Sequence, residues 1–147
     1  MKHITLEIDS DLGSVSLASV AVNAICLLAG LDADQSSQVE LSIVEAITNV
    51  IRHAYHGELN HKVVIAVEVG KIQVHFDIFD TGAPMPPHKV EELIHGEKFV
   101  DPEISDLSLL PEDGRGLQII RSVMDEISYF REGKKNRLIL TKRISRA

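Results

Sequence analysis

Two apolar runs that follow one another directly place the strongest restriction on the fold of this chain. Residues 61–70 (HKVVIAVEVG) and 71–80 (KIQVHFDIFD) are both rich in β-branched and aromatic side chains, and Gly70-Lys71 separates them. Two strand-like runs joined by so short a turn predict a β-hairpin. In the second run, alternate residues form one apolar face: Ile72, Val74, Phe76 and Ile78. The chain is therefore expected to contain an antiparallel sheet with one buried side.

Further strands and helices are predicted on both sides of this hairpin. Residues 2–9 alternate apolar and polar side chains and read as a strand, whereas 14–29 and 35–56 carry apolar residues at helical spacing. After the hairpin come a possible short helix at 88–95, a helix starting near Leu117, and strands at 126–132 and 137–144 joined around Gly133. Gly30 is expected to end the first helix.

The order of these elements, β-α-α-β-β-loop-α-β-β, indicates the fold class. Strands that follow each other directly tend to pair antiparallel. We expect an α+β two-layer sandwich, with a mixed, mainly antiparallel sheet and the helices on one face. The 147 residues suit a single domain, 1–147. The segment 81–114 holds all five prolines and little periodicity, and a loop of this length inside a domain is often functional.

Composition excludes several functions. The net charge of −7 argues against a nucleic-acid binder that relies on phosphate contacts. Cys26 is the only cysteine, so neither an internal disulfide nor a cysteine zinc site is expected, and its apolar neighbours predict a packed thiol. The alternating N-terminus is unlike a signal peptide, and no membrane span is predicted. A soluble cytoplasmic protein is the expectation.

The second predicted helix carries a polar stripe beside its apolar face. Glu45, Asn49 and His53 are spaced four residues apart, so each lies one helical turn from the next. Two interpretations stand at this point. The stripe is either a solvated helix edge, or a hard-cation site in which an amide oxygen holds Mg²⁺ and a carboxylate one turn away acts on a nucleophile. His53, His56 and His61 lack the ligand pattern of a zinc site.

Two further segments each allow a structural and a functional interpretation. In DTGAP, Asp80 ends a strand, and Gly82 is either an ordinary turn residue or a point where a flat ligand approaches while Asp80 accepts a hydrogen bond. In EDGRGLQII, Gly114 and Gly116 precede the helix expected from Leu117. That turn is either a flexible helix start or an anion site built from backbone N–H groups, with Arg115 adding charge.

A cluster of cations lies near the C-terminus: Lys134, Lys135, Arg137, Lys142 and Arg143. It is either a solvated strand face or a docking patch for an acidic partner.

Taken together and in this order, the segments EAITNVIRHAY, DTGAP and GRGLQII, with Met124-Asp125-Glu126 after them, resemble the N, G1 and G2 boxes of the GHKL ATPase superfamily. The residues of these segments resemble those of the branch of anti-sigma factors and serine-protein kinases of the RsbW and SpoIIAB type. The resemblance covers nearly the whole chain. It implies the Bergerat ATP-binding fold, which agrees with the sandwich expected from the pattern.

The resemblance also implies roles for single residues. Asn49 would coordinate Mg²⁺ on the ATP phosphates, and Glu45 would be the general base for an attacking serine hydroxyl. Asp80 would bind the adenine amino group with Gly82 beside it, and His53 would support the site. The segment 85–113 would be the ATP lid. The residues implied to lie against the phosphates are Gly114, Arg115, Gly116 and Leu117.

The function implied is an ATP- and Mg²⁺-dependent serine/threonine protein kinase of the anti-sigma regulatory type. Such a kinase phosphorylates a serine of a small STAS-domain antagonist, an anti-anti-sigma protein, and sequesters a sigma factor or other target by partner switching, commonly as a homodimer. Two rival hypotheses remain open. The chain could be a nucleotide-dependent binding module with little or no kinase activity, or a detached histidine-kinase catalytic domain. Direct contact with nucleic acid or a membrane is not expected.

Overall fold

The computed structural model describes residues 1–96 and 112–145, with side chains from Arg115 onward in the second range. Its elements are β1 (Lys2–Asp9), α1 (Leu12–Ala29), α2 (Ala33–Asn49), the π-helix η1 (Val50–Ala54), β2 (Lys62–Val69), β3 (Gln73–Asp80), α3 (Pro87–His95), α4 (Glu112–Val123), β4 (Glu126–Glu132) and β5 (Lys135–Arg143). The predicted order of strands and helices is confirmed.

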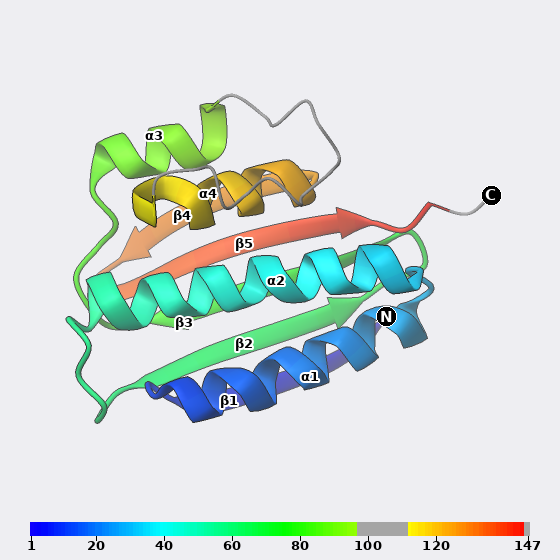
Figure 1. Cartoon of the computed structure of the whole chain (residues 1–147), viewed down its shortest axis with the longest axis horizontal. Helices are drawn as coiled ribbons and strands as arrows, with labels where there is room; N and C mark the ends of the chain where they lie inside the picture. The colour runs from blue at the N-terminus through cyan, green and yellow to red at the C-terminus, as the bar shows by residue number, and fades with distance from the viewer. Residues whose placement is uncertain (97–111, 146–147) are drawn as a thin grey trace.

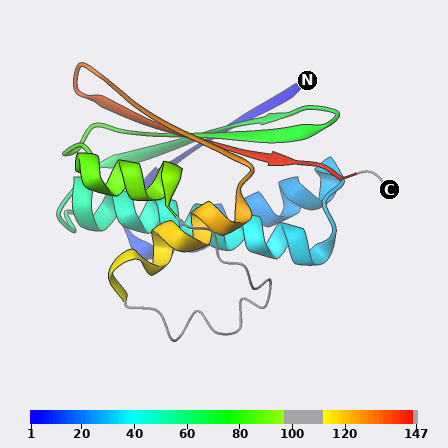
Figure 2. The ribbon, with the colours of Figure 1, turned by 90° about the horizontal axis from the view of Figure 1, so that it is seen from above.

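The strands form one five-stranded sheet in the order β1-β2-β3-β5-β4, and Figure 1 shows the helices lying across it. Figure 2, viewed from above, places the sheet on one side and the helices on the other. The predicted two-layer α+β sandwich is therefore confirmed. Each strand pair among the described residues is antiparallel, so the sheet is simpler than the mixed one expected.

The core lies between the sheet and the helices. Alternation along the strands sends one set of side chains inward, and these are almost fully buried: Val63, Ile65, Val67, Val74, Phe76, Ile78, Leu138 and Leu140. Val39, Ile43 and Ile47 of α2 meet them from the helix layer. Burying side chains of this size stabilises a fold by about 1.5–3 kcal/mol each. This packing determines which flank of α2 lies outside the core and can contact a ligand.

Both long helices begin two residues earlier than predicted, because acidic caps precede them. Asp11 accepts a hydrogen bond from the Ser14 N–H, and this bond lowers the pKa of Asp11. Asp32 and Gln35 form a reciprocal capping box at the start of α2. Gly30 ends α1 in the left-handed region, at φ 111°, as predicted.

The prediction of one helix from 35 to 56 was wrong at its C-terminal end. α2 ends at Asn49 and continues as the π-helix Val50–Ala54, after which the Tyr55 N–H donates to the Val50 carbonyl. A π-turn widens the helix by one residue and is frequent at functional sites. His56 follows with a positive φ of 54°, which is uncommon for a residue other than glycine.

Within the predicted loop 81–114, the short helix expected at 88–95 is confirmed as α3. Most of the remaining segment assigned to an ATP lid, 97–111, lies outside the described residues. Cys26 is fully buried in the core, as predicted, and burial raises its pKa to about 12.

Candidate functional site

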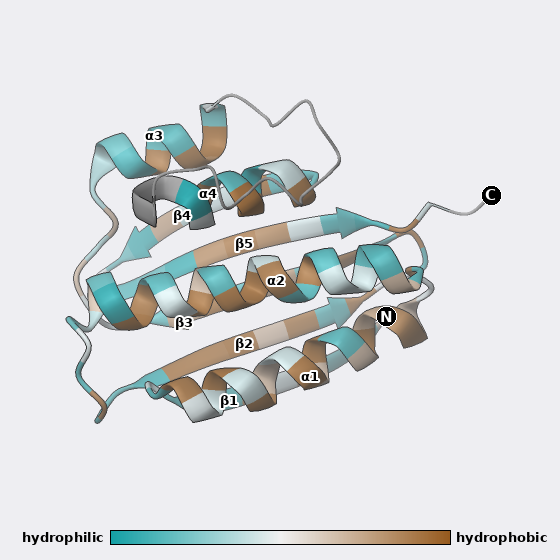
Figure 3. Cartoon of the chain, in the orientation of Figure 1, coloured by the Kyte–Doolittle hydropathy of each residue, from teal (hydrophilic) through white to brown (hydrophobic). Residues whose placement is uncertain are grey.

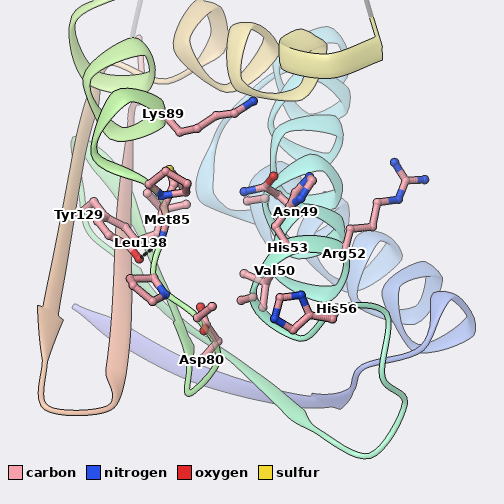
Figure 4. Close-up of a pocket in the computed structure, with 15 residues that line it drawn as sticks. Asn49, Val50, Arg52, His53, His56, Asp80, Met85, Lys89, Tyr129 and Leu138 are labelled. Carbon is pink, nitrogen blue, oxygen red and sulfur yellow. Dashed lines mark hydrogen bonds between the residues drawn. The ribbon is translucent and has the colours of Figure 1, made fainter.

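A pocket of about 370 Å³ opens between the C-terminal end of the α2–η1 helix and the end of β3. Figure 4 shows Asn49, Val50, His53 and His56 on the helix side, facing Asp80, Met85, Tyr129 and Leu138 on the sheet side. The other lining residues are Ala46, Arg52, Ala54, Ala83, Pro84, Pro86 and Lys89. The pocket therefore brings together Asn49, His53 and Asp80, three of the predicted site residues.

Asn49 is the last residue of α2, and its half-buried side chain lines the pocket. Among the described residues, its amide has no hydrogen-bond partner, so its carbonyl oxygen is available to a ligand. His53, one π-turn later, lines the same wall but is exposed. The C-terminal end of the predicted stripe thus faces a cavity. This favours a binding site over a solvated helix edge, because a solvated edge needs no cavity beside it.

Asp80 is the buried acceptor at the floor of the pocket. Its Oδ1 receives two hydrogen bonds, from Asn136 Nδ2 at 2.8 Å and from the Gly82 N–H at 2.9 Å. Burial raises the pKa of Asp80 above its ordinary value, and these two hydrogen bonds oppose the rise. Since both bonds end on Oδ1, the other carboxylate oxygen remains for a donor in the pocket.

Asn136 and Arg131 hold this acceptor, and the prediction from the sequence had missed both. Asn136 is buried and also donates to the Gly82 carbonyl at 3.0 Å. Arg131 Nη1 donates to Asn136 Oδ1 at 2.8 Å and to the same Gly82 carbonyl at 3.1 Å. The available signal was the alternation of the last strand, which puts Asn136 on the same face as Leu138 and Leu140.

Two tyrosines fix the backbone around the pocket. The buried Tyr55 accepts the Thr81 N–H at 3.0 Å and donates to the Lys62 carbonyl at 2.6 Å, which joins the end of η1 to the end of β3. Tyr129 accepts the Met85 N–H at 2.8 Å. Both walls of the pocket are therefore tied to rigid elements.

The turn after β3 requires glycine at position 82 because a side chain would not fit there. A Cβ at this position would collide with the carbonyl oxygen of Ala54, and the adjacent Ala83 N–H donates to that oxygen at 2.9 Å. The glycine thus lets the turn after β3 pack directly against η1. The predicted close approach is present, but the approaching group in this structure is backbone.

Glu45 does not line the pocket. It lies one turn before Asn49, where α2 packs against α4, and a Cβ on Gly116 would come within 2.6 Å of Glu45 Oε2. Gly116 therefore makes room for the carboxylate between the two helices. The structure thus brings together Glu45 and Gly116, two of the predicted site residues, outside the pocket.

The predicted glycine turn before Leu117 was wrong in its local structure. α4 begins at Glu112, so Gly114, Arg115 and Gly116 lie inside the helix. Leu117 is buried in the core, and Arg115 is half-buried. Packing of α4 on α2 outweighs the weak helix propensity of the two glycines. A helix-terminal anion site at this point is not formed.

The C-terminal cations are dispersed. Arg137 pairs with Asp77 at 2.6 Å, Lys135 lies over the Phe79 ring, and Lys142 donates to the Val123 carbonyl. This arrangement favours the solvated strand face over a basic docking patch. Two basic side chains, Arg52 and Lys89, do line the pocket, together with the imidazoles of His53 and His56.

The residues present fit a magnesium ion held mainly by its ligand. Within residues 1–96 and 112–145 there is no group of three His, Cys, Asp or Glu side chains that could hold a metal. Mg²⁺ commonly takes one or two protein oxygens and leaves the rest to water and phosphate. The Asn49 amide in the pocket wall supplies one such oxygen.

Comparison with known proteins agrees with this geometry. The family described as "Histidine kinase-like ATPase domain" matches residues 8–142. The chain is 24% identical over 143 residues to "Serine-protein kinase RsbW" of Listeria innocua, covering 97% of this chain and 87% of that protein. It is 27% identical over 141 residues to the protein of the same name from Staphylococcus epidermidis, covering 88% and 80%.

Solved structures show the same fold. The RsbU and RsbW domains of Rv1364c from Mycobacterium tuberculosis match with a TM-score of 0.67 at 15% identity, over 100% of this chain and 34% of that one. The catalytic domain of the histidine kinase ThkA matches with a TM-score of 0.52 at 14% identity, over 96% and 95%. The chain spans about a third of the Mycobacterium protein. It belongs to the histidine kinase-like ATPase domain family, the GHKL type, and has the Bergerat fold.

Proposed function

We propose that this chain is an ATP- and Mg²⁺-dependent serine/threonine protein kinase of the anti-sigma regulatory type. One observation carries the proposal: the Asn49 amide, which has no hydrogen-bond partner within residues 1–96 and 112–145, and the buried Asp80 carboxylate lie on opposite walls of one pocket. The pocket has the volume of a small-ligand site. The similarity to proteins named serine-protein kinase RsbW supports the same function.

Different residues of the pocket bind the adenine end and the phosphate end of the nucleotide. Asp80 accepts the amino group of adenine on its free oxygen, while Asn136 and Gly82 keep the carboxylate oriented. Asn49 holds the metal, and Mg²⁺ when bound neutralises phosphate charge. Arg52 and Lys89 add positive charge along the walls, and His53 lines the same wall as Asn49. Phosphoryl transfer needs mainly such positioning and charge neutralisation.

Glu45 accepts the proton of the attacking serine hydroxyl, one helical turn from the metal ligand. Gly114, Arg115, Gly116 and Leu117 belong to the segment that meets the phosphates, and 85–113 closes as a lid. Because α4 runs through this segment here, that role requires the start of α4 to unwind when nucleotide binds. Two of the first five residues of α4 are glycine, which lowers the cost of unwinding the helix there.

The substrate is a serine on a small STAS-domain antagonist. Unphosphorylated antagonist binds the kinase and releases its target, such as a sigma factor, and the added phosphate then breaks that complex by charge repulsion and desolvation.

Transfer of the γ-phosphate from labelled ATP to purified STAS-domain proteins encoded beside this chain tests the proposal. We expect transfer that requires Mg²⁺, that yields acid-stable phosphoserine, and that Glu45→Ala abolishes. Acid-labile phosphate would indicate a histidine kinase instead. Absence of transfer from a protein that still binds ATP and the antagonist would refute the kinase.

A nucleotide-dependent binding module is the second candidate, and one observation favours it. Glu45 lies against Gly116, between α2 and α4, and does not line the pocket. A carboxylate used only for helix packing would leave binding without transfer. Under this alternative Glu45→Ala changes partner affinity no more than a surface substitution, and wild type transfers no phosphate.

A further inference from the structure

His56 holds an unusual backbone conformation at the pocket. Its φ of 54° is the only positive value among the residues other than glycine that the structure describes. Such a conformation is uncommon for a residue with a side chain, and it costs free energy that the surrounding structure must offset. Gly57 follows with a φ of 77°. Two successive left-handed residues therefore lead the chain out of η1.

The hydrogen bonds at the end of η1 impose this conformation. The Tyr55 N–H donates to the Val50 carbonyl at 3.0 Å, and the Gly57 N–H donates to the Ile51 carbonyl at 2.8 Å. The chain thus closes back on the helix across His56, as chains do at a helix end with a left-handed residue. Glycine holds such positions most easily. The backbone therefore does not account for an imidazole at position 56.

The imidazole of His56 is also not needed for a contact inside the protein. Within residues 1–96 and 112–145 it makes no hydrogen bond, ion pair or ring contact. His61 in the same loop differs, because it stacks on Tyr55 with ring centroids 4.4 Å apart and pairs with Glu58 at 2.7 Å. His56 is exposed and yet lines the pocket. Its ring is therefore available to a ligand.

Figure 4 places His56 at the end of the pocket that holds Asp80. The two side chains lie across the cavity from each other, with Val50 beside the imidazole, whereas Asn49 and Lys89 lie at the other end. In Figure 3 the helix that leads to this loop finishes in hydrophilic residues, in the teal turn at the left of the view. A nucleotide bound as proposed would have its base beside His56 and its phosphates beside Asn49.

We propose, resting on the function proposed above, that the imidazole of His56 stacks on the adenine base whose amino group donates to Asp80. A base held at its amino group by Asp80 extends from the floor of the pocket toward the opening, where the exposed imidazole lies. Flat side chains stack on the face of a base without needing a hydrogen bond. The buried Val50 continues the same wall inward, so the two side chains together cover one face of the base.

Charge attraction to phosphate is the competing role for this imidazole. Arg52 and Lys89 already line the pocket as cations, and Figure 4 shows Lys89 near Asn49 and far from His56. Stacking needs the flat ring and not the charge, whereas a phosphate contact needs the charge and not the ring. The two roles therefore predict different results for variants that separate ring from charge.

Competition against labelled ATP in the presence of Mg²⁺ tests the stacking role, with adenosine and tripolyphosphate as the competing ligands. His56→Asn removes the ring, and asparagine tolerates a left-handed backbone. We expect ATP and adenosine each to bind this variant about 10-fold more weakly than wild type, and tripolyphosphate to bind equally well. His56→Phe restores a flat ring without charge and should bring the adenosine affinity back to within about 3-fold of wild type.

The matched control is Leu59→Asn, since Leu59 lies in the same loop, is 69% exposed and does not line the pocket. It should leave the affinities for all three ligands unchanged. His56→Asn should melt at no lower temperature than wild type, because asparagine adds no backbone strain at this position. Thermal unfolding of each variant therefore separates loss of binding from loss of folding.

Three results would overturn the stacking role. His56→Asn could bind adenosine as tightly as wild type, or it could lose tripolyphosphate while keeping adenosine, which would assign the imidazole to the phosphates. A folded His56→Phe that binds adenosine as weakly as His56→Asn would show that a flat ring is not what the base contacts. If wild type binds no ATP, the proposed function fails as well. If wild type binds ATP and one of these three results is found, only the role of His56 fails.

Discussion

α1 and α2 lie side by side on the same face of the sheet, but the side chains that they present outside the core differ. Both bury aliphatic residues at helical spacing. Away from the core, α1 offers only apolar or small uncharged groups, whereas the C-terminal flank of α2 offers Glu45 and Asn49. The buried faces therefore explain the fold, and the flanks that packing leaves over decide what each helix can bind.

The two helices also end differently. α1 stops at Gly30, but α2 runs on into the π-turn that carries His53, and the turn after β3 packs against it through Gly82. A polar flank becomes a site only where the helix end meets another element across a cavity. Four predictions test this contrast between a packing helix and a ligand-binding helix.

The largest effect is expected from Glu45→Gln. The amide keeps the size of the side chain and its place against Gly116 but cannot accept a proton. We expect the rate of phosphate transfer to fall by about 10³-fold, with little change in ATP affinity by calorimetry. Glu40→Gln on the same helix, which faces Asn23 of α1, is the control and should keep full activity. Equal losses in both variants would show that the effect comes from helix packing.

Asp80→Asn should lower ATP affinity by about 100-fold. The hydrogen bonds from Asn136 and Gly82 hold the Oδ1 position as an acceptor, so the new NH₂ group faces the pocket and opposes the adenine amino group.

Asp77→Asn is the control for that variant, because Asp77 lies on the open face of β3 and pairs with Arg137. Leu17→Arg, at an exposed position of α1 away from the pocket, should likewise bind ATP as wild type does. A similar affinity for ATP in Asp80→Asn and in wild type would remove Asp80 from the site.

A smaller effect, about a 10-fold rise in the KM for ATP with kcat nearly unchanged, is expected from Asn136→Ala. Loss of the amide frees the Asp80 carboxylate to rotate, and this weakens binding without touching the reacting groups. Steady-state kinetics with the exposed Asn60→Ala as control will measure it. A fall in kcat alone would contradict a positioning role.

The smallest effect concerns stability. Burial raises the pKa of Asp80 above its ordinary value of 3.8, so the folded state favours the protonated acid. The stability that protonated Asp80 contributes is fully present below the pKa that Asp80 has in the unfolded chain. It is lost as the pH rises through the pKa of Asp80 in the folded state. Asp80→Asn cannot ionise and should therefore be more stable than wild type at neutral pH.

Thermal unfolding should show this advantage shrinking as the pH falls toward about 4. An advantage of the same size at both pH values would mean that ionisation of Asp80 is not its cause.

The sequence was sufficient for the element order and for three of the residues at the pocket, Asn49, His53 and Asp80. Alternation in 61–80 and helical spacing in 14–29 are local patterns, and local patterns predict elements well. Asn49 was found because it stands four residues from both Glu45 and His53 on a predicted helix, and Asp80 because it ends a predicted strand. These parts of the prediction needed no knowledge of long-range packing.

Features that depend on contacts between distant segments could not be predicted. The π-turn at Val50–Ala54 and the need for Gly82 both arise where η1 meets the turn after β3. The start of α4 at Glu112 follows from its packing on α2 around Gly116 and Glu45. Asn136 is 56 residues from Asp80 along the chain, and only the sheet register joins them.

Calorimetric titration of ATP into wild type and Asn49→Ala, each with and without Mg²⁺, tests most directly that the end of α2 is a nucleotide site. The account predicts that removing Mg²⁺ weakens ATP binding to wild type by at least about 10-fold, and that Asn49→Ala is nearly insensitive to Mg²⁺. An Asn49→Ala protein that binds ATP tightly and keeps the full Mg²⁺ dependence of wild type would contradict it.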